Sequence, residues 1–502
     1  MKNKIINIVI FLVLILLSAL LIFKEPLNDL DELWQYSFAN NIANGLVPYR
    51  DFNIIVTPFF SFLAAIFLKV FTNQLIVMRI FNTLVFALIL YFACKIFNIL
   101  KINKLKSFIY TFILYLLFYL DLGVEYNYLV LLITLISLYI ELYNINKRGI
   151  FELKYDLLLG ILIGACILTK HSIGTIIAFM FVCYKAIFIQ NKEQFKCFIK
   201  IFAYRVIGII IPVIIFFIYL LANNALNDFI NYAILGITEF SNKVSYTYLL
   251  LSPNKIINIF SILVPITLTM IIILFSLRRE EKYRSITIIL LYSIITFVGM
   301  FPIANTGHFI IYGYIGIIAT IYILDRIISI VIKKMKINKK FQALMKCCIF
   351  CICITCICIY IVNETVNLLS LYKNNNICTY ELKHYYGIIV NNQNLRVIKK
   401  IGEYIENLKE KGKDACILDS TATIYKLPID KYNKDYDLFN KGNFGKNGEE
   451  RLINDISSSK NIQYLILKDE YGKNWQTPFE IINFVKENKV KVGEIELFDI
   501  YE

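Results

Sequence analysis

Long apolar runs separated by short polar segments fill most of the chain before residue 362. A helix needs roughly 20 apolar residues to cross a bilayer, and several runs approach that length. The runs are 5–23, 77–100, 108–120, 128–143, 157–169, 173–189, 201–221, 256–277, 285–301, 309–330 and 344–362. This pattern predicts a polytopic α-helical membrane protein with about eleven transmembrane helices.

One further apolar run, 54–70, decides the orientation of every segment after it. If this run lies along the outer face without crossing, all the basic clusters fall on one side of the membrane. These clusters are 101–106, 147–154, 192–200, 278–284 and 333–340. Cytoplasmic loops of membrane proteins are rich in Lys and Arg. The sequence therefore predicts a multi-pass protein of the cell membrane with a cytoplasmic amino terminus, an uncleaved first span and a juxtamembrane helix at 54–70.

The composition supports this class and excludes another. The chain is 58% hydrophobic, and its net charge of +15 is explained by the basic loops, so no nucleic-acid partner is expected. Six of the twelve cysteines lie between Cys347 and Cys358, where they alternate with Ile in an apolar run. We interpret them as small helix residues in lipid. Acylation of Cys347 or Cys348 is the alternative, and a zinc site is disfavoured.

After Val362 the composition changes to that of a soluble domain, which this topology places outside the membrane. Alternating helix and strand patterns predict a small α/β extracytoplasmic domain. The expected helices are 395–409, 449–457 and 478–488, and the expected strands are 415–419, 463–468 and 495–500. The predicted domains are thus 1–362, transmembrane and catalytic, and 363–502, with 360–394 as a linker.

The stretch 29–60 is polar and acidic although apolar segments flank it, and it belongs to a first outer loop at about 24–76. Its first half predicts a helix that ends at Asn44-Gly45 and carries Asp31 and Glu32 near its start. One face of this helix holds Leu30, Leu33, Trp34, Phe38 and Ile42. Arg50 and Asp51 follow in a predicted loop.

Few other ionisable residues remain on the outer side, and such residues at span ends are candidates for function. They are Asp121, Glu125, Lys170, His171 and His308. Asp121 and Glu125 are spaced to share one face of a helix.

The order of these features resembles the GT-C superfamily of glycosyltransferases that use polyprenyl-phosphate sugars. The resemblance rests on the acidic pair 31–32, the run 45–51 followed by Pro58, and Arg79 at the start of the next span. It continues through the acidic residues of 121–125, the lysine-containing run 169–174 and the late loop 305–309. The chain is most similar to the bacterial branch with protein O-mannosyltransferases and the transferase that adds aminoarabinose to lipid A.

This resemblance implies an inverting transfer of a hexose or pentose from a polyprenyl-phosphate donor to a cell-envelope acceptor, which is a lipid, glycan or protein. In such a reaction a carboxylate takes the acceptor's proton and cations stabilise the leaving phosphate. The expected catalytic residues are Asp31, as base, and Glu32. The expected phosphate ligands are Lys170, Arg50, Arg79, His171 and His308. The expected acceptor-binding or metal-assisting residues are Asp121, Glu125 and Asp51.

The sequence leaves the cofactor and two other functions open. Some members of the superfamily need a divalent cation and others do not, so the metal is undetermined. A secondary transporter has a similar number of spans, but an internal repeat and broken helices are not evident in the sequence. A non-catalytic export or scaffold protein is the second alternative. Each site residue also has a simpler interpretation: Asp31 is a solvated acid, Lys170 reaches the interface by snorkelling, and Asp51 only forms a cap or binds Arg50.

Overall fold

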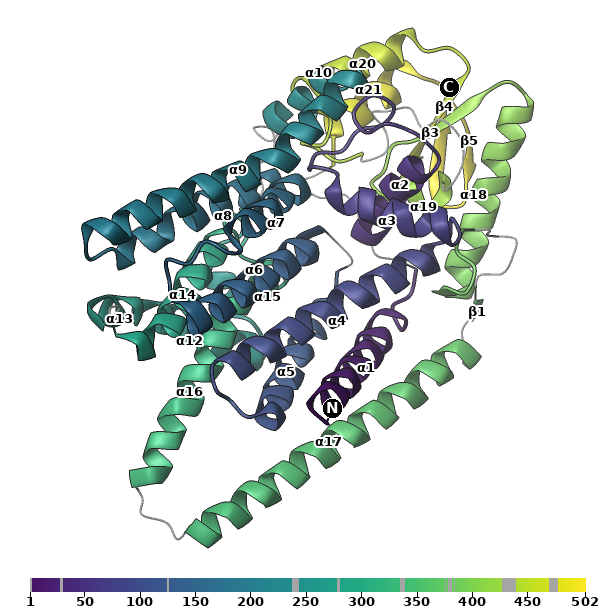
Figure 1. The fold of residues 1–502 in the computed structure, drawn as a ribbon. Coiled ribbons are helices and arrows are strands. Elements are labelled where there is room, and N and C mark those ends of the chain that lie inside the picture. The colour runs from purple at the N-terminus through teal and green to yellow at the C-terminus, as the bar shows by residue number, and fades with distance from the viewer. Residues whose placement is uncertain are drawn as a thin grey trace. The chain divides into compact units, whose positions relative to one another are not determined.

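The computed structural model describes residues 2–27, 30–123, 126–236, 243–277, 280–334, 339–374, 376–377, 382, 384–426, 439–468 and 477–502. The chain forms two compact units (Figure 1). The helical unit comprises Met1–Ile22, Asn82–Ile214 and Asn242–Leu369. The mixed unit comprises Phe23–Phe81, Ile215–Ser241 and Ser370–Glu502. Each unit combines separate stretches of chain, so the predicted domains 1–362 and 363–502 stay a prediction.

The helical unit consists of apolar helices, and every run that was predicted to span the membrane is largely helical. The helices are α1 (Lys2–Ile22), α4 (Leu75–Ile99), α5 (Lys104–Phe118), α6 (Tyr126–Arg148), α7 (Asp156–Thr169), α8 (His171–Cys183), η1 (Tyr184–Phe188), α9 (Lys192–Ala222), α11 (Thr247–Leu250), α12 (Lys255–Thr269), α13 (Ile271–Leu277), α14 (Glu281–Val298), α15 (Thr306–Tyr312), α16 (Tyr314–Lys334) and α17 (Lys339–Asn374). The first residues of α4 and the last residues of α9 and α17 belong to the mixed unit.

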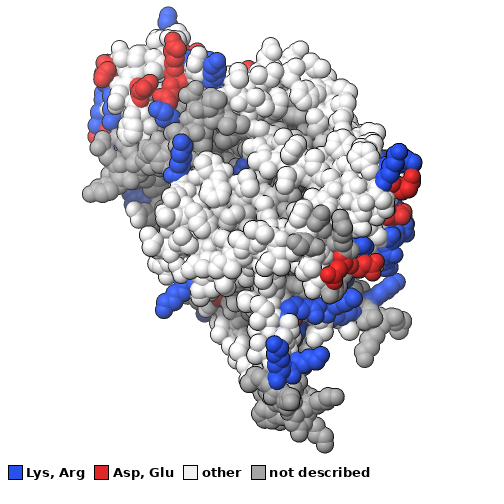
Figure 2. Space-filling model, turned by 90° about the vertical axis from the view of Figure 1, so that its left-hand side faces the viewer, with Lys and Arg blue, Asp and Glu red and all other residues white. Residues whose placement is uncertain are grey.

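Eight helices of the described residues are long and apolar enough to cross a membrane. They are Lys4–Ile22, Leu75–Ile99, Tyr126–Arg148, His171–Phe188, Lys192–Ala222, Lys255–Phe275, Tyr314–Lys334 and Phe350–Asn374. Helices α5 and α7 are shorter than these, and so is the apolar part of α14, Tyr283–Val298. Figure 2 shows a broad uncharged surface with most charged side chains gathered at its margins, as expected for helices in lipid.

Helix ends that the sequence assigned to the cytoplasm lie together in the helical unit. Lys106 at the start of α5 forms an ion pair of 2.7 Å with Asp325 in the second half of α16. Ser285 at the start of α14 donates a hydrogen bond of 3.1 Å to Asn146 at the end of α6. These contacts agree with the predicted alternation of the spans.

The mixed unit contains a small α/β layer. Its elements are α2 (Leu30–Ala43), α3 (Phe59–Val70), α10 (Leu226–Phe229), η2 (Ile230–Leu235), β1 (Asn376–Ile377), β2 (Ile389–Val390), α18 (Asn392–Glu410), β3 (Asp414–Ile417), α19 (Ala422–Lys426), α20 (Gly448–Ser458), β4 (Ile462–Leu467), α21 (Phe479–Asn488), β5 (Lys491–Ile495) and β6 (Phe498–Tyr501). The main sheet has the order β3-β4-β6-β5. Strands β3 and β4 are parallel, and β6 pairs antiparallel with β4 and β5.

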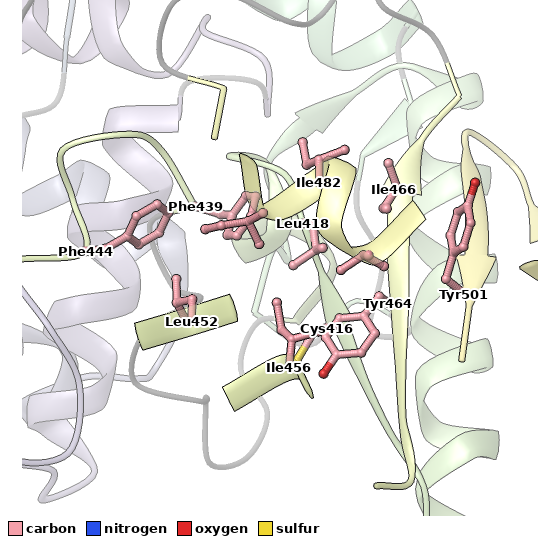
Figure 3. Close-up of a cluster of buried hydrophobic side chains, with 12 residues drawn as sticks. Cys416, Leu418, Phe439, Phe444, Leu452, Ile456, Tyr464, Ile466, Ile482 and Tyr501 are labelled. Atoms are coloured by element: carbon pink, nitrogen blue, oxygen red, sulfur yellow. The ribbon is translucent and has the colours of Figure 1, made fainter. Parts of the chain in front are cut away.

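The sheet is covered on both faces because successive strand residues point to opposite sides. Cys416, Tyr464 and Ile466 face a core formed with Leu452 and Ile456 of α20 and with α21 (Figure 3). The neighbouring residues Ile417 and Leu465 pack on the other side against α18, which contributes Ile401 and Ile405. The predicted α/β layer is therefore confirmed.

Three local predictions are wrong. The strand expected at 495–500 is a hairpin, because Glu496 adopts a φ of 45° between β5 and β6. The linker expected at 360–394 is helical up to Asn374. Helix α2 does not bury one face only, since the polar residues Gln35 and Asn40 are buried as well.

Helix α3 has 12 residues and is about 18 Å long, too short to cross a bilayer. It packs on α2 within the mixed unit, and the rings of Phe60 and Phe81 lie edge to face at 5.5 Å. This length and packing favour the predicted juxtamembrane helix over a further span.

Candidate functional site

Lys170 lies at the tip of a helical hairpin in the helical unit. Helix α7 ends at Thr169 and α8 begins at His171, so Lys170 is the only residue between them. Its extended backbone, with φ −150° and ψ 101°, reverses the chain. The side chain emerges where two apolar helices end, and the residue is partly exposed. Such a position brings an ammonium group to the boundary of an apolar layer.

Two neutral side chains hold the Lys170 ammonium in place. Nζ donates hydrogen bonds to Asn127 Oδ1 at 2.9 Å and to Tyr312 Oη at 3.1 Å. Tyr312 Oη in turn donates to Asn127 Oδ1 at 2.6 Å. The rings of Tyr126 and Tyr312 lie 5.3 and 5.5 Å from Nζ, within the range of cation–π attraction. These contacts hold the ammonium group in a defined position.

His308 lies next to this group, and its ring stands 5.8 Å from that of Tyr312. Asn305 Oδ1 accepts hydrogen bonds from the backbone N–H of His308 at 2.9 Å and from Nδ1 at 2.8 Å. Because the backbone group only donates, it identifies the accepting oxygen, and Nδ1 must carry the proton. Burial and the charge of Lys170 lower the pKa of His308 to about 4.

A neutral His308 with its proton on Nδ1 presents a lone pair at Nε2. This tautomer suits a hydrogen bond from a hydroxyl group better than contact with a phosphate oxygen. The predicted phosphate contact of His308 stays a prediction, and it requires the opposite protonation of Nε2.

Asp121 is exposed in the turn after α5 and lies beside Gly307, the residue before His308. A Cβ atom at Gly307 would stand 3.0 Å from Asp121 Oδ2, so a side chain there would crowd the carboxylate. Surrounding protein raises the pKa of Asp121, although a hydrogen bond from the Gly307 backbone opposes this effect. Glu125, its predicted companion, lies outside the described residues.

His171 follows Lys170 and differs from His308. Both of its ring nitrogens are buried, and within the described part of the chain neither has a hydrogen-bond partner. Lys170, His308 and Asp121 thus lie at one end of the helical unit with His171 adjacent, and their proposed roles remain predictions.

In the mixed unit, Asp31 and Glu32 occupy the first turn of α2 but point to different surroundings. Asp31 is exposed, whereas Glu32 is buried. The guanidinium of Arg79 grips the Glu32 carboxylate with Nε–Oε1 and Nη2–Oε2 distances of 2.8 and 2.7 Å. Arg79 also donates to the carbonyl of Glu25 at 2.6 Å and is only 1% exposed. This geometry favours an orienting role for Glu32 and a structural one for Arg79.

Arg50 and Asp51 form a local pair at the tip of a tight loop. Arg50 donates to both Asp51 oxygens at 2.9 and 2.8 Å, and the Val47 backbone N–H donates to Asp51 at 2.7 Å. The loop turns at the buried Tyr49, which has a φ of 69°. The hydrogen bonds that Arg50 donates to Asp51 raise the pKa of Arg50, which therefore stays charged. The geometry matches the local interpretation of Asp51, while Arg50 remains partly exposed.

Helix α2 is also tied to the carboxy-terminal part of the mixed unit, which the sequence did not indicate. Trp34 Nε1 donates to the Ser420 carbonyl at 3.2 Å, directly after β3. Tyr36 Oη donates to the Asn73 carbonyl at 2.8 Å and contacts His384 Nδ1 at 3.1 Å. The helix that carries Asp31 is therefore fixed from both sides.

Sequence reasoning missed the partners of Lys170 and a second polar cluster. Asn127 and Tyr312 carry no charge, so nothing in the pattern distinguished them from ordinary interface residues. The second cluster consists of Glu141, Asp156, Lys185 and Arg205. Charged residues within apolar runs were the available signal. Among the described residues, no group of three His, Cys, Asp or Glu side chains is placed to hold a metal ion.

No model of a known protein family matches the chain, and no curated protein matches it in sequence. Among solved structures, the chain is similar to the oligosaccharyltransferase AglB from Archaeoglobus fulgidus. One structure is a complex with an inhibitory peptide and a dolichol-phosphate, with a TM-score of 0.45, and the other is the apo form, with 0.46. Identity is 13% in both, over 86% of this chain and 61% of that chain. This similarity is too low to carry an argument, and the chain spans less than two thirds of the length of AglB.

Proposed function

We propose that this chain is a membrane glycosyltransferase that moves a sugar from a polyprenyl-phosphate donor to a cell-envelope acceptor on the outer face. The observation that carries the proposal is the Lys170 group. A partly exposed ammonium lies at the tip where α7 ends and α8 begins, and Asn127 and Tyr312 position it. A lipid phosphate lies at the same boundary between apolar chains and water. Lys170 offers the charge that such a phosphate needs when it leaves.

The proposed reaction breaks the bond between the anomeric carbon and the phosphate oxygen and forms a bond from that carbon to the acceptor oxygen or nitrogen. The electron pair of the broken bond stays on the phosphate, where Lys170 stabilises the charge. The acceptor's proton passes to the carboxylate of Asp31, which acts as general base. Attack from the side opposite the phosphate inverts the anomeric configuration.

The other candidate residues take supporting roles in this proposal. Glu32, held by Arg79, orients the first turn of α2. His171 and His308 line the donor side next to Lys170, and Arg50 offers a second cation on an exposed loop. The carboxylates of Asp121, Glu125 and Asp51 bind the acceptor or assist a divalent cation.

The proposed topology has eleven crossings, a cytoplasmic amino terminus and an outer carboxy-terminal domain. The contact of α5 with α16 and the contact of α6 with α14 support this alternation. Reporter tags at Lys104 and Lys336 should therefore respond as cytoplasmic. An outer response from either tag would overturn the orientation.

Transfer by the purified protein, supplied with a panel of polyprenyl-phosphate sugars, tests the function. With the accepted donor, Asp31→Asn should lower turnover by about a hundredfold or more, because the variant loses the base but keeps nearly the same shape. Donor binding should change little. Glu193→Gln is the matched control, since Glu193 is also exposed in the first turn of a helix and lies outside the proposed site.

Two results would contradict the proposal. Near-normal turnover in Asp31→Asn would remove Asp31 from the mechanism. A folded protein that transfers no sugar from any donor in the panel would favour the export or scaffold alternative.

A further inference from the structure

A buried ion cluster joins α6, α7, η1 and α9 within the helical unit. Arg205 contacts Glu141 Oε2 at 2.8 Å and Asp156 Oδ1 at 2.6 Å. Lys185 contacts Glu141 Oε1 at 2.8 Å and Asp156 Oδ1 at 3.5 Å. All four side chains are at most 1% exposed. Two acids and two bases therefore meet in a site closed to water.

Such a cluster is a poor device for stability alone. Charges lose their hydration when they are buried, and apolar residues of similar size often give an equally stable protein. Here the compensation is also incomplete, because Asp156 Oδ2 has no hydrogen-bond partner among the described residues. The cluster does restrict how the helices can be arranged. The Arg205 guanidinium also donates to the Phe181 carbonyl at 2.6 Å, so it binds α6, α7 and α8 at the same time.

The position of the cluster along the chain relates it to Lys170. Helix α7 begins at Asp156 and ends next to Lys170, and α8 returns from the tip to the short helix that holds Lys185. The start of α7 and the helix that follows α8 are therefore both held by residues of the cluster. Helix α7 has 14 residues, so its end at the cluster and its end at the tip lie about 21 Å apart.

Helix α6 repeats this spacing. Asn127, the partner of Lys170, and Glu141, the partner of Arg205, lie about 21 Å apart along α6. The hairpin and α6 are thus connected at two points, by Lys170 and Asn127 at the tip and by Glu141 in the cluster. A shift of α7 along α6 would disturb the contacts at both points.

The helices between the two levels are packed closely enough to transmit position. A Cβ atom at Gly160 of α7 would lie 2.4 Å from the Arg205 carbonyl oxygen of α9. A Cβ atom at Gly174 of α8 would lie 2.6 Å from the Cys166 carbonyl oxygen of α7. These backbone contacts leave no space for α7 to shift against either neighbour.

We infer that the cluster of Glu141, Asp156, Lys185 and Arg205 sets the axial position of the α7–α8 hairpin, and that it thereby positions Lys170 for the donor phosphate. The second half of this inference rests on the proposed function. The first half concerns the hairpin alone. Hydrogen exchange tests the first half, and binding of polyprenyl phosphate tests the second.

The first measurement is hydrogen exchange in the full-length protein. Arg205→Lys keeps the positive charge and loses the planar fork that spans two carboxylates. The amides of Lys170 and Gly174, bonded to Cys166 and Lys170 in the wild type, should exchange severalfold faster in this variant. Asp325→Asn is the matched control, because it breaks an ion pair of the same unit that does not touch the hairpin. Unchanged exchange at the tip in a folded Arg205→Lys protein would overturn the inference.

The second measurement is binding of polyprenyl phosphate to the same proteins. Arg205→Lys should weaken binding by about tenfold, since small displacements of a positioning group have effects of this order or larger. In a double-mutant cycle of Arg205→Lys and Lys170→Gln, the losses of binding from the two single variants should not add. A displaced tip has no effect on binding once the Lys170 ammonium has been removed. A cluster that only supported the fold would give additive losses, and that result would overturn the positioning role.

If Arg205→Lys does not fold, Asp156→Asn, which keeps size and removes one charge, takes its place in both measurements with the same expectations. If exchange at the tip rises as expected but wild-type protein does not bind polyprenyl phosphate, the proposed function is overturned and the control of the hairpin by the cluster stands.

Discussion

Lys170 in the helical unit and Arg79 in the mixed unit are both cations that the sequence assigned to the donor phosphate, yet their surroundings differ. Arg79 is 1% exposed, and its fork is occupied by the Glu32 carboxylate and a backbone carbonyl. Lys170 is partly exposed at a hairpin tip, where an amide oxygen and a phenol position it. One cation is built into the protein interior, and the other can reach a ligand.

The difference shows why residue type and order alone do not separate charges that are buried within the fold from charges that stay accessible. Arginine offers several fixed donors, so it is suited to hold a buried carboxylate and two chain segments at once. Lysine offers a compact charge on a flexible stem, which suits an exposed tip. Each cation therefore has a distinct expected response when it is removed.

The largest effect is expected from breaking the Arg79–Glu32 pair. Glu32→Ala leaves the Arg79 charge buried without its carboxylate, which should lower the free energy of unfolding by about 3–5 kcal/mol. The thermal midpoint of the purified protein, measured in detergent, checks this loss. The double variant Glu32→Met with Arg79→Met removes both charges and should recover most of the stability. A single variant as stable as the wild type would show that the pair carries little structural weight.

The fold was predictable from the sequence to a large extent, because hydrophobic length and periodicity are strong signals. Every predicted span is largely helical, and the strands at Asp414–Ile417 and Ile462–Leu467 form where their apolar residues indicated. The failures are local: Glu496 turns the chain inside one expected strand, and α17 continues beyond the predicted span to Asn374. A positive φ is uncommon for a glutamate, and mixed polar and apolar residues do not fix where a helix ends, so neither feature had a clear signal in the sequence.

The proximity of three candidate residues was predictable from the sequence, but the partners of those residues were not. The sequence indicated that Asp121, Lys170 and His308 share one end of the spans, and the structure places them there. It did not indicate Asn127 as the residue that positions Lys170, since a neutral amide in a helix has no distinctive pattern. It also gave no means to recognise that Glu32 binds Arg79, because the two are far apart in the chain.

A smaller effect, on the ligand and not on the fold, is expected at Lys170. Lys170→Gln should reduce the affinity for, or use of, the polyprenyl-phosphate donor by about tenfold to a hundredfold, as expected from losing one charged contact to a leaving phosphate. The thermal midpoint should stay near that of the wild type, in contrast to Glu32→Ala. Lys170→Arg should retain part of the activity because it keeps the charge. Unchanged donor affinity and rate in Lys170→Gln would assign this lysine to snorkelling and contradict its role at the phosphate.

The smallest effect concerns His308 and tests whether the charge of Lys170 reaches its neighbours. The pKa of His308 is about 4 in the folded protein, lowered by burial and by Lys170, whereas an unfolded histidine titrates near 6.5. Between these values the unfolded chain binds more protons, so this residue makes stability fall as the pH drops from about 6.5 towards 4. The raised pKa of Asp121 acts in the opposite direction and remains in every variant.

The decrease in thermal midpoint from pH 7 to pH 5 should therefore be smaller in His308→Gln than in the wild type, because glutamine does not titrate. Lys170→Gln should also give a smaller fall than the wild type, because removing the neighbouring charge lets the pKa of His308 rise while burial still lowers it. Glu32→Ala, in the other unit, should leave the slope between the two pH values unchanged even though its midpoint is lower throughout. An identical slope in wild type and His308→Gln would mean that His308 is not held neutral by its surroundings, and the lone pair assigned to Nε2 would lose its support.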